Sequence, residues 1–72
     1  MYGIEYLDET IMEEAKKQFD RVYPEFPCEV LGANNNRDAV VVKCNFPDGT
    51  FYFKVTNNSV SHAYDTLEKA VN

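Results

Sequence analysis

Three side chains of this sequence could in principle support catalysis. His62 and Asp65 lie three residues apart, so on a helix they would share a face and could touch. A His-Asp pair is half of the arrangement that activates a nucleophile, and the available nucleophile is Cys44. Cys44 falls at an inward-facing position of a predicted strand. We therefore expect no catalytic residues and no enzymatic activity.

The two cysteines, Cys28 and Cys44, are expected to be buried, reduced thiols that act as small apolar side chains. A structural zinc site needs four ligands, and beyond the cysteines the sequence offers only His62. No metal and no cofactor are expected. Residues 1–7 lack the basic and apolar regions of a signal peptide, and no apolar run could span a bilayer. The predicted location is the cytoplasm.

The acidic excess is concentrated in the first half of the chain. Seven basic residues face twelve acidic ones, for a net charge of -5, and residues 1–38 hold nine acids and four bases. Because nucleic-acid binding relies on Lys and Arg, duplex nucleic acid is a disfavoured partner. The charge instead predicts a partner protein with a basic surface, met by the first helix. The candidate residues are Asp8, Glu9, Glu13, Glu14 and Asp20, with Glu5 nearby.

The first helix is predicted from a capping box at Thr10 and Glu13, followed by apolar residues on one face. Pro24 ends this helix, because the residue before a proline is pushed out of the helical region. Residues 2–7 fit either the alternation of a strand or an extension of the helical spacing, and both interpretations stay open.

Three strands are predicted in the middle of the chain, at residues 28–32, 39–46 and 51–56. A two-residue turn centred on Asp48 and Gly49 joins the last two strands. This register places six apolar side chains on one face of the hairpin. The expected pairs are Phe46 with Phe51, Cys44 with Phe53, and Val42 with Val55.

Antiparallel pairing of the first two strands would place Cys28 opposite Cys44 and Val30 opposite Val42. The other face of the sheet is expected to be solvated. There Tyr52 could stack on a base while lysines hold phosphates, as in single-strand binders. The residues of this alternative site are Lys43, Asn45, Tyr52 and Lys54.

A second helix is predicted from a cap at Asn58 or Ser59 to Val71, because apolar residues recur at helical spacing. The predicted fold is one α+β domain over residues 1–72. It is a two-layer α-β-β-β-α arrangement, with both helices packed on one face of a three-stranded antiparallel sheet. An exposed edge strand could also pair two copies into a homodimer.

The order of elements over residues 10–71 is similar to that of the double-stranded RNA-binding domain. Ala63, Leu67 and Ala70 stand where that family's final helix packs small apolar residues. The sequence departs from the family where its last helix begins with a lysine cluster, since residues 59–63 contain no lysine. The resemblance implies a nucleic-acid-binding fold, and the departure favours a protein-binding derivative.

The sequence therefore predicts a small acidic regulator or inhibitor that docks on another protein, of the sort that phages and mobile elements encode. The alternative is a nucleic-acid-binding module that uses the sheet face around Tyr52. The two hypotheses differ in the surface they use and in the sign of the charge on the partner.

Overall fold

A computed structural model describes residues 8–72 of the chain. Residues 2–7, for which the sequence fits either a strand or a helix, lie outside this range, and so does the candidate residue Glu5. Its elements are α1 (Glu9–Val22), β1 (Cys28–Ala33), β2 (Val40–Phe46), β3 (Gly49–Val55) and α2 (Leu67–Val71). The strands form one antiparallel sheet in the order β1-β2-β3. The predicted α+β class, order of elements and antiparallel sheet are confirmed. No helix in residues 8–72 has the length and apolar character needed to cross a membrane.

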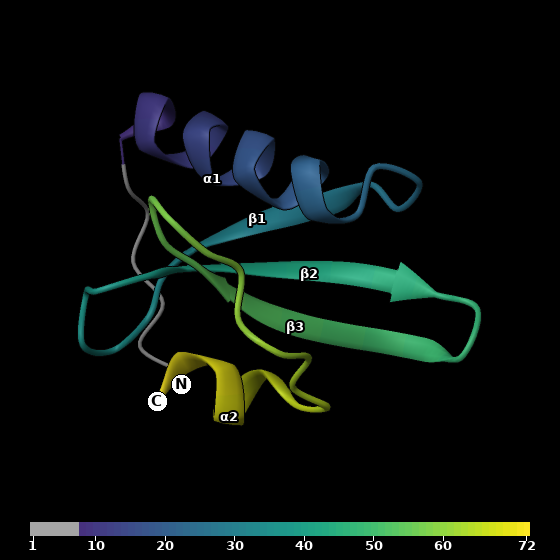
Figure 1. The fold of residues 1–72 in the computed structure, drawn as a ribbon. Helices are drawn as coiled ribbons and strands as arrows, with labels where there is room; N and C mark the ends of the chain where they lie inside the picture. Colours follow the sequence, from purple (N-terminus) through teal and green to yellow (C-terminus); the bar gives the residue numbers. More distant parts are fainter. Residues whose placement is uncertain (1–7) are drawn as a thin grey trace.

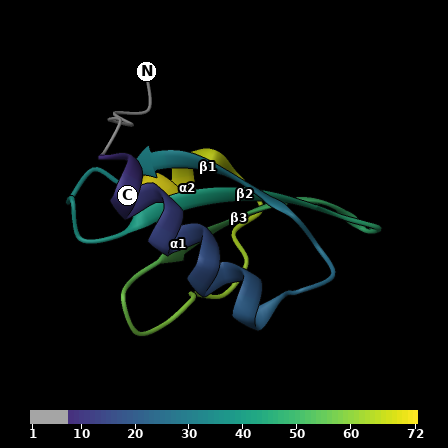
Figure 2. The ribbon, with the colours of Figure 1, turned by 90° about the horizontal axis from the view of Figure 1, so that it is seen from above.

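The helices cover opposite faces of the sheet, so the molecule has three layers (Figure 1 and Figure 2). Ala15 and Phe19 of α1 pack on the face that carries Val42. Ala70 and Val71 of α2 pack on the other face, against Val41. The prediction that both helices share one face is wrong. The central strand has valine at three successive positions, so it is apolar on both sides. Each side must therefore be shielded from water by another element.

The hairpin turn is centred on Pro47 and Asp48, one residue earlier than predicted. Phe46 lies opposite Gly49, and the predicted pairs are shifted by two residues, so that Cys44 faces Phe51. Proline fixes a φ that suits the first turn position, and Gly49 has a φ of +140°, which side-chain-bearing residues rarely adopt. Because the side-chain period of a strand is two, the shift leaves every predicted core side chain on the same face.

The pairing of β1 with β2 follows the prediction, with Cys28 opposite Cys44 and Val30 opposite Val42. The register then slips between Val30 and Gly32, where Leu31 is the additional residue of a β-bulge. Leu31 packs with the α2 cluster. Val30 packs with the cluster on the α1 side, so β1 has an apolar contact on each face of the sheet.

Aromatic rings fill the space between α1 and the hairpin. The ring of Phe19 lies 5.1 Å from that of Phe53 and 5.0 Å from that of Tyr23. Tyr23 in turn meets Phe46 at 5.6 Å, edge to face. Tilted and edge-on arrangements are the ones that aromatic quadrupoles favour, and each adds about 0.5–1.5 kcal/mol to the burial of apolar area.

The segment after β3 does not form the predicted long helix. Residues 59–64 instead run beside β3, where Tyr52 and Tyr64 exchange backbone hydrogen bonds of 2.9 and 2.8 Å. The Lys54 amide donates to Ser61 Oγ at 2.9 Å. These contacts satisfy outward-pointing amides of β3, which a helix here would leave without a strand partner. α2 therefore begins only after Thr66, whose side chain accepts a hydrogen bond from the Lys69 amide.

The loop between β1 and β2 is built on one buried polar residue, Asn34, which is 2% exposed. Its Oδ1 accepts hydrogen bonds from the amides of Asp38 and Ala39, both at 3.1 Å, and its Nδ2 donates to Asp38 Oδ1. The next residue, Asn35, donates its amide to Val71 O at 2.7 Å. Asn34 thus fixes a loop that also holds the end of α2.

Replacement of Asn34 by alanine is expected to lower the free energy of unfolding by about 2–4 kcal/mol, because the part-buried amides of Asp38 and Ala39 lose their acceptor and a buried side chain is removed. Urea denaturation followed by circular dichroism measures this. Asn36→Ala, at an exposed position of the same loop, is the matched control and should change stability by less than about 0.5 kcal/mol. Equal effects of the two substitutions would contradict the role of Asn34.

Candidate functional site

The charges of α1 are separated along the helix axis. Its N-terminal half carries exposed carboxylates with no basic residue among them, whereas Lys16, Lys17 and Arg21 follow in the second half. Asp20 is half-buried and stands apart, among these bases. Within residues 8–72 none of the five predicted carboxylates forms an ion pair. The first-half carboxylates are Asp8, Glu9, Glu13 and Glu14.

A cap at Asp8 explains where α1 begins. The Asp8 carboxylate accepts a hydrogen bond from the Thr10 amide at 2.8 Å, and the helix starts at Glu9. The predicted capping box at Thr10 and Glu13 is therefore wrong, because Asp8 caps the helix two residues earlier. Negative side chains at this end also interact favourably with the helix dipole. Among the carboxylates in the first half of α1, Asp8 is thus the one that caps the helix.

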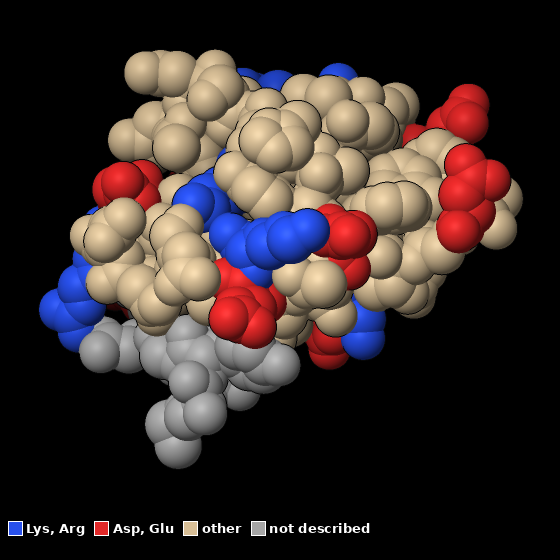
Figure 3. Space-filling view, turned by 90° about the horizontal axis from the view of Figure 1, so that it is seen from below, with Lys and Arg blue, Asp and Glu red and all other residues tan. Residues whose placement is uncertain are grey.

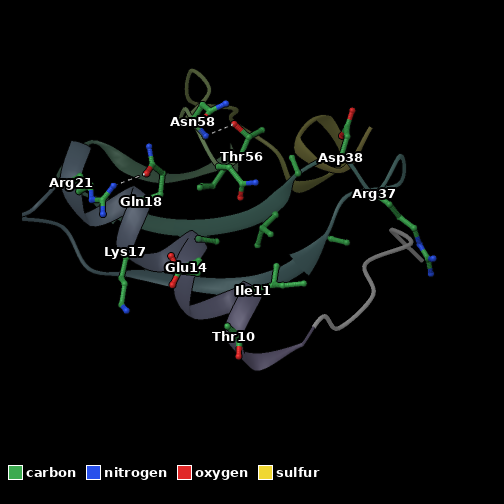
Figure 4. A pocket seen from close by; sticks show the side chains of 16 residues that line it. Thr10, Ile11, Glu14, Lys17, Gln18, Arg21, Arg37, Asp38, Thr56 and Asn58 are labelled. Carbon is green, nitrogen blue, oxygen red and sulfur yellow. Dashed lines mark hydrogen bonds between the residues drawn. The ribbon is translucent and has the colours of Figure 1, made fainter.

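A groove of about 540 Å³ lies between α1 and the neighbouring ends of β2 and β3 (Figure 4). The volume falls within the range of ligand-binding clefts, about 300–1,000 Å³. Its lining includes small and branched apolar side chains: Ala15, Ala33, Ala39, Val40 and Val55. Polar and charged side chains from α1, from the β1–β2 loop and from the loop after β3 border it, among them the bases Lys17, Arg21 and Arg37 and the acids Glu14 and Asp38. The groove therefore combines apolar surface with a polar rim.

The two walls of the groove come from distant parts of the chain. On the helix side Gln18 is hydrogen-bonded to Arg21, and on the loop side the Asn58 amide donates to Thr56 (Figure 4). Ile11, which is 48% exposed, also lines the groove, at the acidic end of α1. Sequence reasoning missed this groove, because it depends on how α1 crosses the sheet.

The alternative site on the sheet face is largely covered. Tyr52 is half-buried in the cluster formed by α2, so the prediction of an exposed aromatic on a solvated face is wrong. Lys54 donates to the backbone oxygen of Asn72, and its Nζ lies 5.5 Å from the centre of the Tyr64 ring. Asn45 is exposed and accepts a hydrogen bond from Thr50, and Lys43 is half-buried. These residues form no open stacking platform.

The charges on the α2 side are mixed. Figure 3 shows basic side chains near the centre of this face, bordered by acidic ones. One such contact is the 2.9 Å ion pair between Lys69 and Asp65. Lys69 also lowers the pKa of the Asp65 carboxyl by hydrogen bonding and by its charge. The lysines expected to hold phosphates therefore share this face with carboxylates.

The His62 and Asp65 side chains are not brought together. Asp65 pairs with Lys69, and the His62 ring instead lies 4.4 Å from that of Tyr64. Both residues precede α2, so the helical spacing that would have aligned them does not exist. Cys44 is 1% exposed, as its predicted inward position implied.

The two edges of the sheet differ. The outer edge of β3 is occupied by residues 59–64, whereas β1 has no further strand beside it in residues 8–72. The β-bulge at Leu31 interrupts this edge, and bulges are one way in which proteins discourage edge pairing. Homodimer formation through an edge strand therefore stays a prediction, and β1 is the edge strand through which it would occur.

Comparison with protein-family models, curated proteins and solved structures finds no match to the chain. The likeness to the double-stranded RNA-binding domain is limited to the order of elements, since Ala63 precedes α2 and α2 covers the face opposite α1.

Removal of the cap should distinguish Asp8 from Thr10. We expect Asp8→Ala to lower the free energy of unfolding by about 1 kcal/mol, because the Thr10 amide loses its acceptor. Thr10→Ala leaves that amide and its acceptor in place and is expected to have a smaller effect. Thermal and urea unfolding of the two variants provides the measurement. A larger loss with Thr10→Ala would restore the capping box in place of the Asp8 cap.

Proposed function

We propose that this chain is a non-enzymatic regulator or inhibitor that binds a partner protein through the first half of α1 and the adjoining groove. The observation that carries the proposal is the half-exposed Ile11, which lines the groove on the half of α1 whose carboxylates form no ion pair within residues 8–72. We call this the α1–groove surface. It consists of the first half of α1, with Asp8, Glu9, Ile11, Glu13 and Glu14, and of the adjoining groove, whose lining also holds the bases Lys17, Arg21 and Arg37.

The carboxylates in the first half of α1 indicate the chemistry of the partner. Glu9, Glu13 and Glu14 form no ion pair within residues 8–72 and are available to a basic partner, whereas Asp8 also caps α1. Complementary charge raises the association rate and disfavours wrong partners more than it adds affinity. Salt screens such interactions over a distance of about 8–10 Å at physiological ionic strength. The association is therefore expected to weaken as salt is added.

Apolar contact would supply the affinity that exposed charges alone do not. Burial of apolar surface contributes about 25 cal/mol per Å², and the half-exposed Ile11 offers such surface next to the charges. Interfaces commonly have this organisation, with an apolar centre and a polar rim that excludes water. The groove is suited to accept an apolar side chain of the partner.

Nucleic-acid binding, the alternative function, has weaker support. It relied on Tyr52 as an exposed stacking residue, and Tyr52 packs in the α2 cluster. Lys54 is engaged with Asn72. Protein binding through the α1–groove surface requires neither residue to rearrange.

Charge reversal on α1 tests the proposal. The chain is used as bait in an extract of its native source, and the captured protein is purified. We expect Glu9→Lys, Glu13→Lys and Glu14→Lys together to weaken its binding at least about tenfold, because complementary charge becomes like charge. Isothermal titration calorimetry measures the change. The wild-type affinity should also fall as ionic strength rises from about 50 to about 500 mM.

The matched control reverses three exposed acids that lie outside the α1–groove surface: Glu25→Lys, Asp48→Lys and Glu68→Lys. Both triple variants change the net charge equally, so an effect of overall charge would appear in both. Equal weakening, or an affinity that does not depend on salt, would contradict docking through α1. Tight binding of single-stranded or duplex RNA at physiological salt in a gel shift would favour the alternative function.

The apolar part of the surface has its own test in two residues of α1 that are almost equally exposed, Ile11 at 48% and Val22 at 49%. Ile11 lines the groove and Val22 does not. We expect Ile11→Ser to weaken partner binding about fivefold or more, as for a contact that contributes about 1 kcal/mol. Val22→Ser should leave affinity unchanged. A loss with Val22→Ser alone would place the interface at the other end of α1.

A further inference from the structure

The two cysteines occupy directly opposed positions on neighbouring strands, Cys28 on β1 and Cys44 on β2. Both side chains point to the α1 face, since Cys44 belongs to the core cluster there and Cys28 packs against it. Both are free thiols. Cys44 is buried, whereas Cys28 is half-buried and is the more exposed residue of the pair.

The backbone hydrogen bonds identify the type of this pair. The amides of Tyr52 and Lys54 bond away from β2, to Tyr64 O and Ser61 Oγ. The alternate residues of β3, including Phe51, must therefore be the ones that bond to β2. Cys44 lies opposite Phe51, so its backbone groups point to β3 and not to β1. Cys28 and Cys44 thus form a non-hydrogen-bonded pair.

Residues in a non-hydrogen-bonded antiparallel pair have Cα atoms about 4.5 Å apart, and disulfides span Cα separations of about 4.4–6.8 Å. The pair therefore meets the spacing requirement without movement of either strand. The Cys44 Sγ already lies 3.5 Å from the carbonyl oxygen of Pro27 and 3.7 Å from that of Phe26, the two residues before Cys28. The Cys44 sulfur is thus directed toward the start of β1.

We propose that Cys28 and Cys44 are a redox modification site, which forms a reversible cross-strand disulfide by exchange with a small-molecule disulfide such as oxidised glutathione. This inference stands on the strand register and is independent of the proposed protein-binding function.

The exchange takes two steps. The Cys28 thiolate attacks one sulfur of glutathione disulfide, the S–S bond breaks, and one glutathione leaves as a thiolate that takes up the proton lost by Cys28. The Cys44 sulfur then attacks the Cys28 sulfur and displaces the second glutathione, which takes up the Cys44 proton. The two protein thiols are oxidised by two electrons, and the small disulfide is reduced to two thiols.

The surroundings of Cys28 make this reaction slow at neutral pH. Burial, the negative charge of Asp20 and the neighbouring Cys44 raise the pKa of Cys28 to about 11, against a smaller lowering by Lys16. Burial also raises the pKa of the Cys44 thiol. Because the thiolate is the attacking species, exchange should become faster as the pH rises toward the pKa of Cys28. The site therefore responds to sustained oxidation rather than to brief exposure.

Titration of the intact chain with mixtures of oxidised and reduced glutathione, at mildly alkaline pH, tests the proposal. We expect a monomer that has lost two hydrogens by intact-mass spectrometry, with a peptide cross-linked between Cys28 and Cys44, and full reversal by dithiothreitol. The same titration in urea supplies the reference. Folding should shift the equilibrium toward the cystine by at least about tenfold, because the native register holds the two residues together.

Two single variants complete the experiment, Cys28→Ser and Cys44→Ala, and neither can form an internal cystine. The Cys44→Ala variant should stop at the glutathione adduct on Cys28. A wild-type chain that yields only glutathione adducts or covalent dimers would overturn the proposal. So would a cystine that forms more readily in urea than in the folded chain, since that result would show that the native register opposes the bond.

Discussion

The central strand β2 is buried on both of its faces, and this constraint determines how the rest of the chain is arranged. Val41 and Val42 are both 0% exposed although they point to opposite sides of the sheet. A chain of 72 residues has few elements with which to exclude water from two surfaces at once. α1 covers one side, with Phe19 and Ala15, and the short α2 covers the other, with Ala70 and Val71. The three layers follow from this requirement.

The same constraint explains why the surfaces available for function are few. The face opposite α1 would be open if both helices lay together, and Tyr52 would then be exposed. α2 occupies that face, and the loop around Asn34 holds its end through the bond from Asn35 to Val71. On the other side, α1 packs mainly against β1. The groove lies beside it, at the ends of β2 and β3, with Val40 and Val55 in its lining.

The predictable part of the fold was the part governed by local patterns. Strand alternation placed Phe53 and Cys44 in the core, and an even shift of the hairpin register could not move them to the other face. The opposition of Cys28 and Cys44 followed from the pairing of β1 with β2.

The length of α2 was not predictable in this way. Apolar residues from Val60 to Val71 fit a helix, but the outward amides of β3 bind residues 59–64. The charged residues of the candidate site could be identified from sequence, whereas the groove required the crossing of α1 over the sheet.

The two ends of α1 support different chemistry, which makes the two proposals separable. The first half carries Ile11 at the groove and carboxylates that have no ion-pair partner in the described part of the chain, residues 8–72. Asp20 and Lys16, in the second half, act electrostatically on Cys28. A cystine between β1 and β2 would join two strands that are already paired, so it need not displace the first half of α1. A variant could therefore lose protein binding while its cysteine pair still forms the disulfide, and another could lose the disulfide while it still binds the partner. The effect of oxidation on binding would depend on how far a partner extends along α1 toward Asp20.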